Sequence, residues 1–194
     1  VLAAGQSKRM GSNKLLADLG GAPMIRRSVE AVLAAGIDSM IVVTGHEADK
    51  IAAALEGLGI EIVHNPDYAH GLATSLKRGL AAVPEDADAV LVCLGDMPRV
   101  TPKVMGRLIA AFNPEELRTI CVPVHRGQRG NPVLWGAKHF AAMAALDGDR
   151  GAKALMEQFA DELVEIEMAD DGVLIDADTP EALARLRSGP ATGS

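Results

Sequence analysis

The chain has 194 residues, is 48% hydrophobic but only 3% aromatic, and carries a formal net charge of −7 at pH 7. This length suits one domain with a substantial buried core, which must be built from Ala, Val, Leu, Ile and Met because aromatic residues are scarce. The acidic balance and the few aromatic rings argue against a nucleic-acid-binding protein, which needs a basic face and stacking platforms.

Short β-branched runs alternate along the chain with stretches that carry apolar residues at helical spacing. After an apolar, strand-like start, we predict in chain order a helix over 24–35, a strand over 40–43, a helix over 47–58, a strand over 60–63, a helix over 72–83 and a strand over 89–94. Further strands are predicted over 119–124, 163–166 and 173–175, before a closing helix over 180–186. This alternation predicts an α/β fold, with a single three-layer, doubly wound, Rossmann-like domain and a mostly parallel sheet.

No apolar run approaches the roughly 20 residues that a membrane-spanning helix needs, and the start of the chain lacks the features of a signal peptide. Cys93 and Cys121 are far apart, with no C-x-x-C spacing, so we interpret them as reduced core thiols of a cytoplasmic protein. We predict one domain over 1–187 and a disordered tail over 188–194. Because Val1 falls inside a strand-like run, we expect a few residues to precede it.

The opening loop concentrates positive charge. Lys8, Arg9 and Lys14 occur before the first acidic residue of the chain, and Gly5 and Gly11 in the same segment allow close backbone approach. Backbone N–H groups together with Lys and Arg side chains form cradles for polyphosphates. The segment matches neither a P-loop nor a G-x-G-x-x-G motif nor a nucleophile elbow. A phosphate cradle and an ordinary solvated basic turn are therefore the two interpretations.

Acidic residues concentrate near the other end, with nine between Asp161 and Glu181 and no Lys or Arg among them. A separate carboxylate, Asp96, follows the strand predicted over 89–94 through Gly95. Ligands of doubly wound sheets bind beyond the carboxyl ends of the strands, and a carboxylate there suits Mg²⁺, which takes one or two carboxylates plus substrate phosphates. The alternative is an Asp that only forms a turn.

Longer segments resemble a known superfamily. Leu2-Ala3-Ala4-Gly5-x-Ser7-x-Arg9-Met10-Gly11-x-x-Lys14 resembles the signature of the nucleotidyltransferases that activate molybdenum cofactor, sugar phosphates and methylerythritol phosphate. Within that superfamily, segments along nearly the whole chain resemble the molybdenum cofactor cytidylyltransferases: 65–76, 95–98, 130–134, 148–152 and 175–180. Guanylyl relatives tend to have Gly-Gly where this chain has Ala4-Gly5, so the resemblance favours cytosine over guanine.

The resemblance implies an enzyme that transfers CMP from CTP to the terminal phosphate of molybdopterin or molybdenum cofactor, with Mg²⁺ as cofactor and a recipient molybdoenzyme as a possible partner. Arg9, Lys14 and Asp96 would be catalytic, and Asp96 and Asp178 would hold the metal. The implied nucleotide-binding residues are Leu2, Ala3, Ala4, Gly5, Gln6, Ser7, Gly11, Gly71, Leu72, Ser75 and Gly95. The implied substrate-binding residues are Arg129, Asn131, Arg150 and Lys153.

Several alternatives stay open in the sequence. Side chains alternate along an extended segment, so only one of Asp176 and Asp178 can face the site, and we favour Asp178. The basic segment 125–132 suits a mobile loop that binds phosphate or an ordinary hairpin, and Lys153 stands where the family usually has Arg. A GTP-dependent guanylyltransferase, another nucleotidyltransferase, or a non-catalytic nucleotide-binding module that delivers cofactor are the competing functions.

Overall fold

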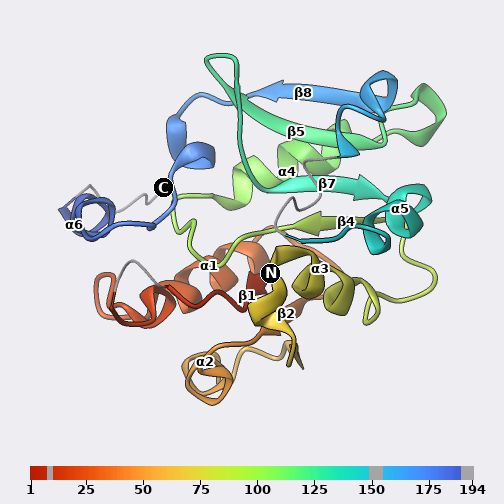
Figure 1. Cartoon of the computed structure of the whole chain (residues 1–194). Coiled ribbons are helices and arrows are strands. Elements are labelled where there is room, and N and C mark those ends of the chain that lie inside the picture. Colours follow the sequence, from red (N-terminus) through yellow and green to blue (C-terminus); the bar gives the residue numbers. More distant parts are fainter. Residues whose placement is uncertain (8–10, 149–154, 189–194) are drawn as a thin grey trace.

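Parallel strands build the amino-terminal half of the sheet. The computed structural model describes residues 1–7, 11–148 and 155–188 (Figure 1). β1 (Leu2–Ala3) and β3 (Glu61–His64) both pair in parallel with β2 (Ile41–Thr44). A parallel bridge between Leu2 and Leu94 then joins β1 to the end of β4 (Ala89–Val92). The carboxyl ends of these strands therefore meet at one edge of the sheet, where the doubly wound topology places ligands.

The second half of the sheet contains antiparallel strands that the sequence analysis did not predict. β7 (Val133–Gly136) lies antiparallel between β4 and β5 (Ile120–His125), and β6 (Gln128–Arg129) returns from β5 as a hairpin. β8 (Leu163–Glu167) pairs in parallel with β5. Figure 1 shows these strands side by side, from β8 at the top through β5, β7 and β4 to β1 and β2. The prediction of a Rossmann-like fold with a mostly parallel sheet is confirmed, with β7 inserted antiparallel between β4 and β5.

Helices cover both faces of the sheet, as predicted for a three-layer domain. α1 (Met24–Leu33), α2 (Ala48–Ala54) and α4 (Pro102–Ala111) contribute to the core on one face. α3 (Leu72–Leu80) and α5 (Phe140–Ala144) contribute to the core on the other face, which Figure 1 presents to the viewer. No helix in the described ranges is long and apolar enough to cross a membrane.

Strand alternation explains how one sheet separates two cores. Successive side chains of a strand point to opposite faces. In β5, Cys121 packs into the core with α1 and α4, whereas Ile120 and Val122 pack into the core with α3 and α5. Trp135 of β7, fully buried, joins the second core. Because both faces are covered, β5 is apolar at every position from Ile120 to Val124.

Besides the unpredicted β6, β7 and α5, the structure departs from the predicted elements at three further places. α4 was not predicted, although Thr101 accepts a hydrogen bond from the Val104 amide at 3.4 Å and Pro102 opens the helix, as at a helix start. The strand predicted over 173–175 is wrong, because Asp171–Leu174 forms a 3₁₀ turn that is capped by Asp170. α6 (Pro180–Ser188) includes Ser188, where the tail was predicted to begin, and 189–194 lie outside the described residues.

Short 3₁₀ turns fill many of the connections. Those of the described chain not already given are η1 (Lys14–Leu16), η2 (Tyr68–His70), η3 (Pro114–Glu116), η4 (Ala137–His139) and η6 (Ala160–Glu162). η1 and η2 follow β1 and β3 at the edge where the carboxyl ends of the parallel strands meet. They therefore contribute to the site described below.

The carboxyl-terminal segment returns to the start of the chain. Leu183 of α6 and Ala177 form a small third core with Met24, the first residue of α1. The Arg187 guanidinium donates a hydrogen bond at 3.1 Å to the carbonyl of Asp18. This packing anchors the segment before α6 beside the first loop, and Figure 1 shows α6 at that side of the sheet.

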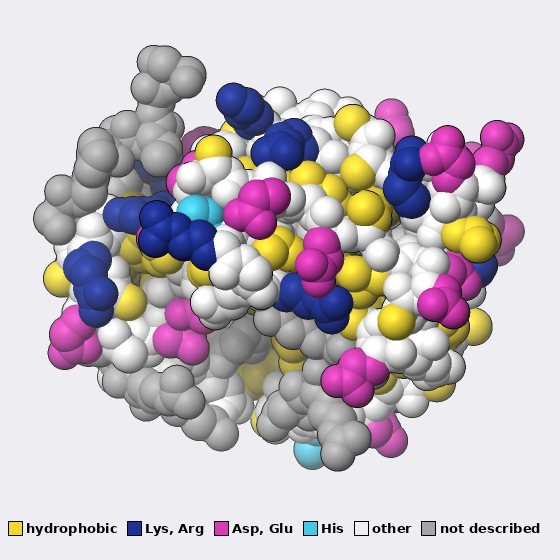
Figure 2. All heavy atoms as spheres, turned by 90° about the horizontal axis from the view of Figure 1, so that it is seen from above, with side chains coloured by type: hydrophobic (Ala, Val, Ile, Leu, Met, Phe, Trp, Pro, Cys, Tyr) yellow, Lys and Arg dark blue, Asp and Glu magenta, His cyan; other side chains and the backbone are white. Residues whose placement is uncertain are grey.

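Two acids of the segment near the carboxyl end pair with neighbouring cations. Glu162 forms an ion pair with Lys138 at 2.8 Å, and Glu165 forms one with Arg129 at 2.6 Å. Figure 2, which views the molecule from above, shows positive and negative side chains interspersed over this face. Exposed pairs of this kind each contribute between 0 and about 1 kcal/mol, so the segment mainly forms a charged surface.

Replacing Gly130 with Ala should destabilise the fold, because a Cβ there would lie 2.2 Å from the Val173 carbonyl oxygen, a backbone atom. We expect Gly130→Ala to lower the free energy of unfolding by about 1–3 kcal/mol, as overpacking does. Gly106→Ala is the matched control: its Cβ would meet nothing within 4 Å inside α4, and it should raise stability by about 0.5–1 kcal/mol. Denaturant unfolding measures both, and equal effects would contradict the packing of this segment.

Candidate functional site

A cleft of about 620 Å³ opens at the carboxyl ends of the parallel strands. Its walls come from the opening loop, η1, η2, the start of α3, the end of β4 and the segment before α6. The residues that line it are Leu2, Ala4, Gly5, Gln6, Ser7, Lys14, Leu15, Tyr68, Ala69, Gly71, Leu72, Ser75, Leu94, Asp96 and Asp178. The cleft lies where ligands bind in doubly wound sheets.

Lys14 joins two carboxylates that are far apart in the sequence. Its Nζ lies 2.5 Å from Oδ2 of Asp96 and also forms an ion pair with Oδ1 of Asp178. The side chains of Lys14 and Asp96 are mostly buried, whereas that of Asp178 is 46% exposed. Burial alone would lower the pKa of Lys14, but the two carboxylates outweigh it and raise that pKa above its usual value.

Hydrogen bonds within the opening loop fix the backbone of Lys14. The Lys14 amide donates to Ser7 Oγ at 3.1 Å, and the Leu15 amide donates to Asn13 Oδ1 at 3.2 Å. Leu15 is buried and anchors the turn in the main core. The loop from Ser7 to Lys14 is therefore closed at its base, while Arg9 lies outside the described residues.

Gly95 lets β4 approach the first strand and the first helix. Its amide donates to the Leu2 carbonyl at 3.0 Å, and its carbonyl accepts from Ser28 Oγ at 2.9 Å. A Cβ at this position would lie 2.7 Å from the Cδ1 atom of Ile25. Gly95 was predicted to bind nucleotide, but it is a packing residue next to the cleft rather than part of its lining. It sets the position of Asp96.

Asp178, and not Asp176, lines the cleft. Between them, Ala177 is fully buried and its amide donates to the Asp96 carbonyl at 3.1 Å. The two aspartates therefore alternate about a buried residue. Partial burial, followed by the negative charges of Asp178 and Asp96, raises the pKa of Asp176. Of the two aspartates, the docking of this segment on Asp96 therefore places Asp178 in the cleft lining.

Asn65 organises the loop that leads into α3. Its side-chain nitrogen donates to Thr74 Oγ1 at 2.9 Å and to Ser75 Oγ at 3.0 Å, and its side-chain oxygen accepts from the Asp67 amide at 3.0 Å. Only 2% of Asn65 is exposed. Gly71, Leu72 and Ser75, which were predicted to bind nucleotide, line the cleft. None of these residues caps the start of α3 with its side chain.

Gly45 and Tyr68 shape the cleft wall next to Ala4, and the sequence analysis did not identify them. A Cβ on Gly45 would lie 2.5 Å from Tyr68 Cβ and 2.8 Å from Ala4 Cβ. The amide of His46 donates to the Ala4 carbonyl at 3.3 Å. The sequence did contain a signal for each: Gly45 follows the strand predicted over 40–43, and Tyr68 lies within the 65–76 segment.

Of the residues predicted to bind the second substrate, Arg129 and Asn131 are described by the structure, and neither lines the cleft. Arg129 pairs with Glu165, and the Asn131 amide donates to the Val173 carbonyl at 2.9 Å. The segment that contains them turns at Arg126 and Gly127, both with positive φ, so it is the ordinary hairpin and not an open loop. Arg150 and Lys153 lie outside the described residues.

Two other predicted nucleotide-binding residues also lie off the cleft lining. Ala3 is 1% exposed and packs in the main core, because strand alternation turns it away from the cleft. Gly11 is exposed and has a φ of 70°. Its conformation favours glycine for the turn of the loop rather than for ligand contact.

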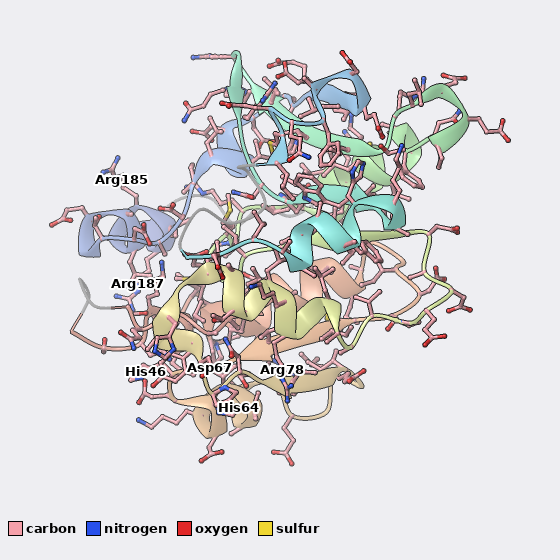
Figure 3. All side chains as sticks on the ribbon, turned by 45° about the vertical axis from the view of Figure 1, so that its right-hand side comes forward. His46, His64, Asp67, Arg78, Arg185 and Arg187 are labelled. Carbon is pink, nitrogen blue, oxygen red and sulfur yellow. The ribbon has the colours of Figure 1, made fainter. Side chains whose placement is uncertain are left out.

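The candidate metal ligands are Asp96 and Asp178, the two carboxylates that pair with the Lys14 ammonium. Over the described residues, no group of three or more His, Cys, Asp or Glu side chains could hold a metal ion. His46, His64 and Asp67, which Figure 3 labels, therefore do not form such a group, although they follow or belong to β2, β3 and the start of η2. A cation already bridges Asp96 and Asp178, namely the Lys14 ammonium. Two oxygen ligands and an open cleft fit a Mg²⁺ ion that completes its shell with water and substrate phosphates.

The model of the MobA-like NTP transferase domain matches residues 1–164 of this sequence. The chain belongs to the MobA-like NTP transferase family. It is therefore a nucleotidyltransferase, and the resemblance of its opening segment to nucleotidyltransferases is confirmed. The cleft described above opens on that segment.

Relatives within and around the MobA-like family differ in their named activities. The chain is 28% identical over 192 residues to nicotine blue oxidoreductase of Paenarthrobacter nicotinovorans, covering 96% of this chain and 94% of the relative. It is 26% identical over 182 residues to molybdenum cofactor cytidylyltransferase of Escherichia coli K12, covering 93% and 90%. A solved structure, Rv0371C of Mycobacterium tuberculosis H37Rv in complex with manganese, has 28% identity and a TM-score of 0.81, with 95% and 94% covered.

Gly45→Ala should weaken nucleoside triphosphate binding, because Tyr68 and Ala4 would both have to move. We expect a rise of about tenfold in Kd by isothermal titration, which corresponds to about 1.4 kcal/mol. Gly106→Ala, distant in α4 and with open space around its Cβ, should bind like the unmodified chain. Unchanged affinity of Gly45→Ala, in a variant with native circular dichroism, would show that this wall does not contact the nucleotide.

Proposed function

We propose that the chain is a CTP-dependent cytidylyltransferase that transfers CMP to the terminal phosphate of molybdopterin or molybdenum cofactor and releases pyrophosphate. The observation that supports it most is the meeting of Lys14, Asp96 and Asp178 on a cleft lined by the opening loop. The Escherichia coli relative carries this activity in its name. A recipient molybdoenzyme is the partner that such a product implies.

The reaction needs positioning and charge neutralisation more than proton transfer. An oxygen of the acceptor phosphate, already ionised near neutral pH, forms a bond to the α-phosphorus of CTP. The bond from that phosphorus to the α,β-bridging oxygen breaks in line, and its electron pair leaves with pyrophosphate. No general base is required, so the rate depends on how the cleft holds the two phosphates together.

Lys14 and Arg9 are the cations that we assign to the triphosphate. The hydrogen bond from the Lys14 amide to Ser7 holds the backbone of Lys14 beside the cleft. The Lys14 ammonium would neutralise negative charge on the pyrophosphate leaving group. Asp96 and Asp178 would hold Mg²⁺, which when bound supplies charge neutralisation at the phosphates. The manganese complex of the Mycobacterium tuberculosis relative supports a divalent ion in this type of protein.

Cytosine is the base that the wall around Ala4 favours. Ala4 is 6% exposed and lines the cleft, as does Tyr68, and a Cβ on Gly45 would lie 2.8 Å from the Ala4 Cβ. Glycine at position 4, as in guanylyl relatives, would remove a methyl group from this wall. A smaller base therefore suits Ala4, and GTP is the alternative nucleotide.

A panel of nucleoside triphosphates with molybdopterin as acceptor tests the substrate. We expect pyrophosphate release to be fastest with CTP, by about tenfold or more over GTP, since small differences in pocket size are worth about 1–3 kcal/mol. Faster release with GTP would replace the cytidylyl assignment by a guanylyl one. Binding of CTP by isothermal titration without any pyrophosphate release would favour a non-catalytic nucleotide-binding module.

Asp96→Asn and Asp178→Asn should each lower kcat by about 10²–10³-fold, the loss typical of one charge-stabilising group. Asp176→Asn is the matched control, because Asp176 is near the same charges but does not line the cleft, and its kcat should change less than tenfold, in line with its indirect charge effect. Steady-state pyrophosphate release at saturating Mg²⁺ measures all three. A larger loss for Asp176→Asn than for Asp178→Asn would exchange their roles.

A further inference from the structure

One ammonium group occupies the oxygens that the proposed function assigns to a metal. Lys14 Nζ contacts Oδ2 of Asp96 and Oδ1 of Asp178 at the same time. Without a cation between them, two carboxylates this close would repel each other. Lys14 therefore stabilises the pair in the structure described here.

A divalent ion that bridges the two carboxylates would need the space that the Lys14 ammonium fills. Mg²⁺ binds carboxylate oxygens at about 2.0–2.1 Å, while the ammonium nitrogen of Lys14 already lies 2.5 Å from Asp96. Two cations cannot share these oxygens at such distances without strong mutual repulsion. Binding of one therefore requires the other to leave.

The geometry lets Lys14 leave by rotation of its side chain alone. Its backbone is held by Ser7 Oγ and by the turn that begins at Asn13. The side chain is a flexible four-carbon stem that ends in three donors, and it borders the 620 Å³ cleft. Asp178, 46% exposed, leaves the carboxylate pair open on one side.

We propose that Lys14 is a built-in competitor of the metal: it bridges Asp96 and Asp178 in the nucleotide-free protein and moves to the triphosphate when a divalent ion binds with the nucleotide. This rests on the proposed function, because it takes its metal ligands from it. The nucleotide phosphates provide the new partner for the displaced ammonium. Metal and nucleotide must then strengthen each other's binding, and by the same factor in both directions.

The direct test is metal affinity without nucleotide. Lys14→Met keeps an unbranched stem and removes the charge. We expect this variant to bind Mn²⁺ about tenfold or more tightly than the unmodified chain by isothermal titration, since a full positive charge beside both ligands is gone. Lys77→Met is the matched control: Lys77 pairs with Asp147 at 3.2 Å on the surface, and its loss should leave the affinity for Mn²⁺ unchanged.

Thermal unfolding gives a second readout that does not depend on activity. With EDTA, Lys14→Met should melt at a lower temperature than the unmodified chain, because its carboxylates repel, and Mn²⁺ should restore the loss. CTP should then increase the Mn²⁺ affinity of the unmodified chain by a larger factor than that of Lys14→Met.

The outcomes separate this inference from the proposed function. If Lys14→Met binds Mn²⁺ no more tightly than the unmodified chain, while Asp96→Asn loses both Mn²⁺ binding and turnover, the competition is wrong and the cytidylyltransferase proposal stands. If neither the unmodified chain nor Lys14→Met binds millimolar Mn²⁺, with or without CTP, the metal assignment fails and the competition fails with it.

Discussion

The contact of the Lys14 ammonium with Asp96 and Asp178 depends on three distant parts of the chain arriving at one place. The parallel bridge from Leu2 to Leu94 brings the end of β4 next to the opening loop. The small core around Met24 and Leu183 brings the segment before α6 to the same edge. Hydrophobic packing thus offsets the cost of placing charged groups in a partly desolvated cluster.

Close backbone approach defines the cleft as much as charge does. Gly95 admits the Ile25 side chain, and Gly45 admits Tyr68 against Ala4. A side chain at position 45 would displace Tyr68 or Ala4 in the cleft wall, and one at position 95 would displace Ile25 beneath Asp96. The polar network of Asn65 then holds the η2 loop in place, through hydrogen bonds made by a side chain that is itself buried. The cleft is therefore formed by rigid surroundings and not by loops alone.

Net charge describes this protein poorly, because the charges act locally. The total of −7 includes a basic opening loop and an acidic segment near the carboxyl end. In the folded protein most acids of that segment lie on the surface, where Glu162 and Glu165 pair with cations. Asp178 is the member of the segment that lines the cleft in the described structure. A polyanionic substrate is compatible with the acidic total, since Lys14 and a divalent ion would act at short range.

The sequence by itself determined the elements of the parallel half of the sheet, because β2, β4, α1 and α3 each carry their own apolar period and turn residues. It also determined that the opening loop and Asp96 lie at strand ends. Only the tertiary structure decided that β7 enters antiparallel, that 125–132 is a hairpin carrying Arg129 away from the cleft, and that Asp178 rather than Asp176 reaches Lys14. The pairing of β7 with β4 and the docking of Ala177 on Asp96 depend on contacts between distant segments, whose energies no local pattern of residues contains.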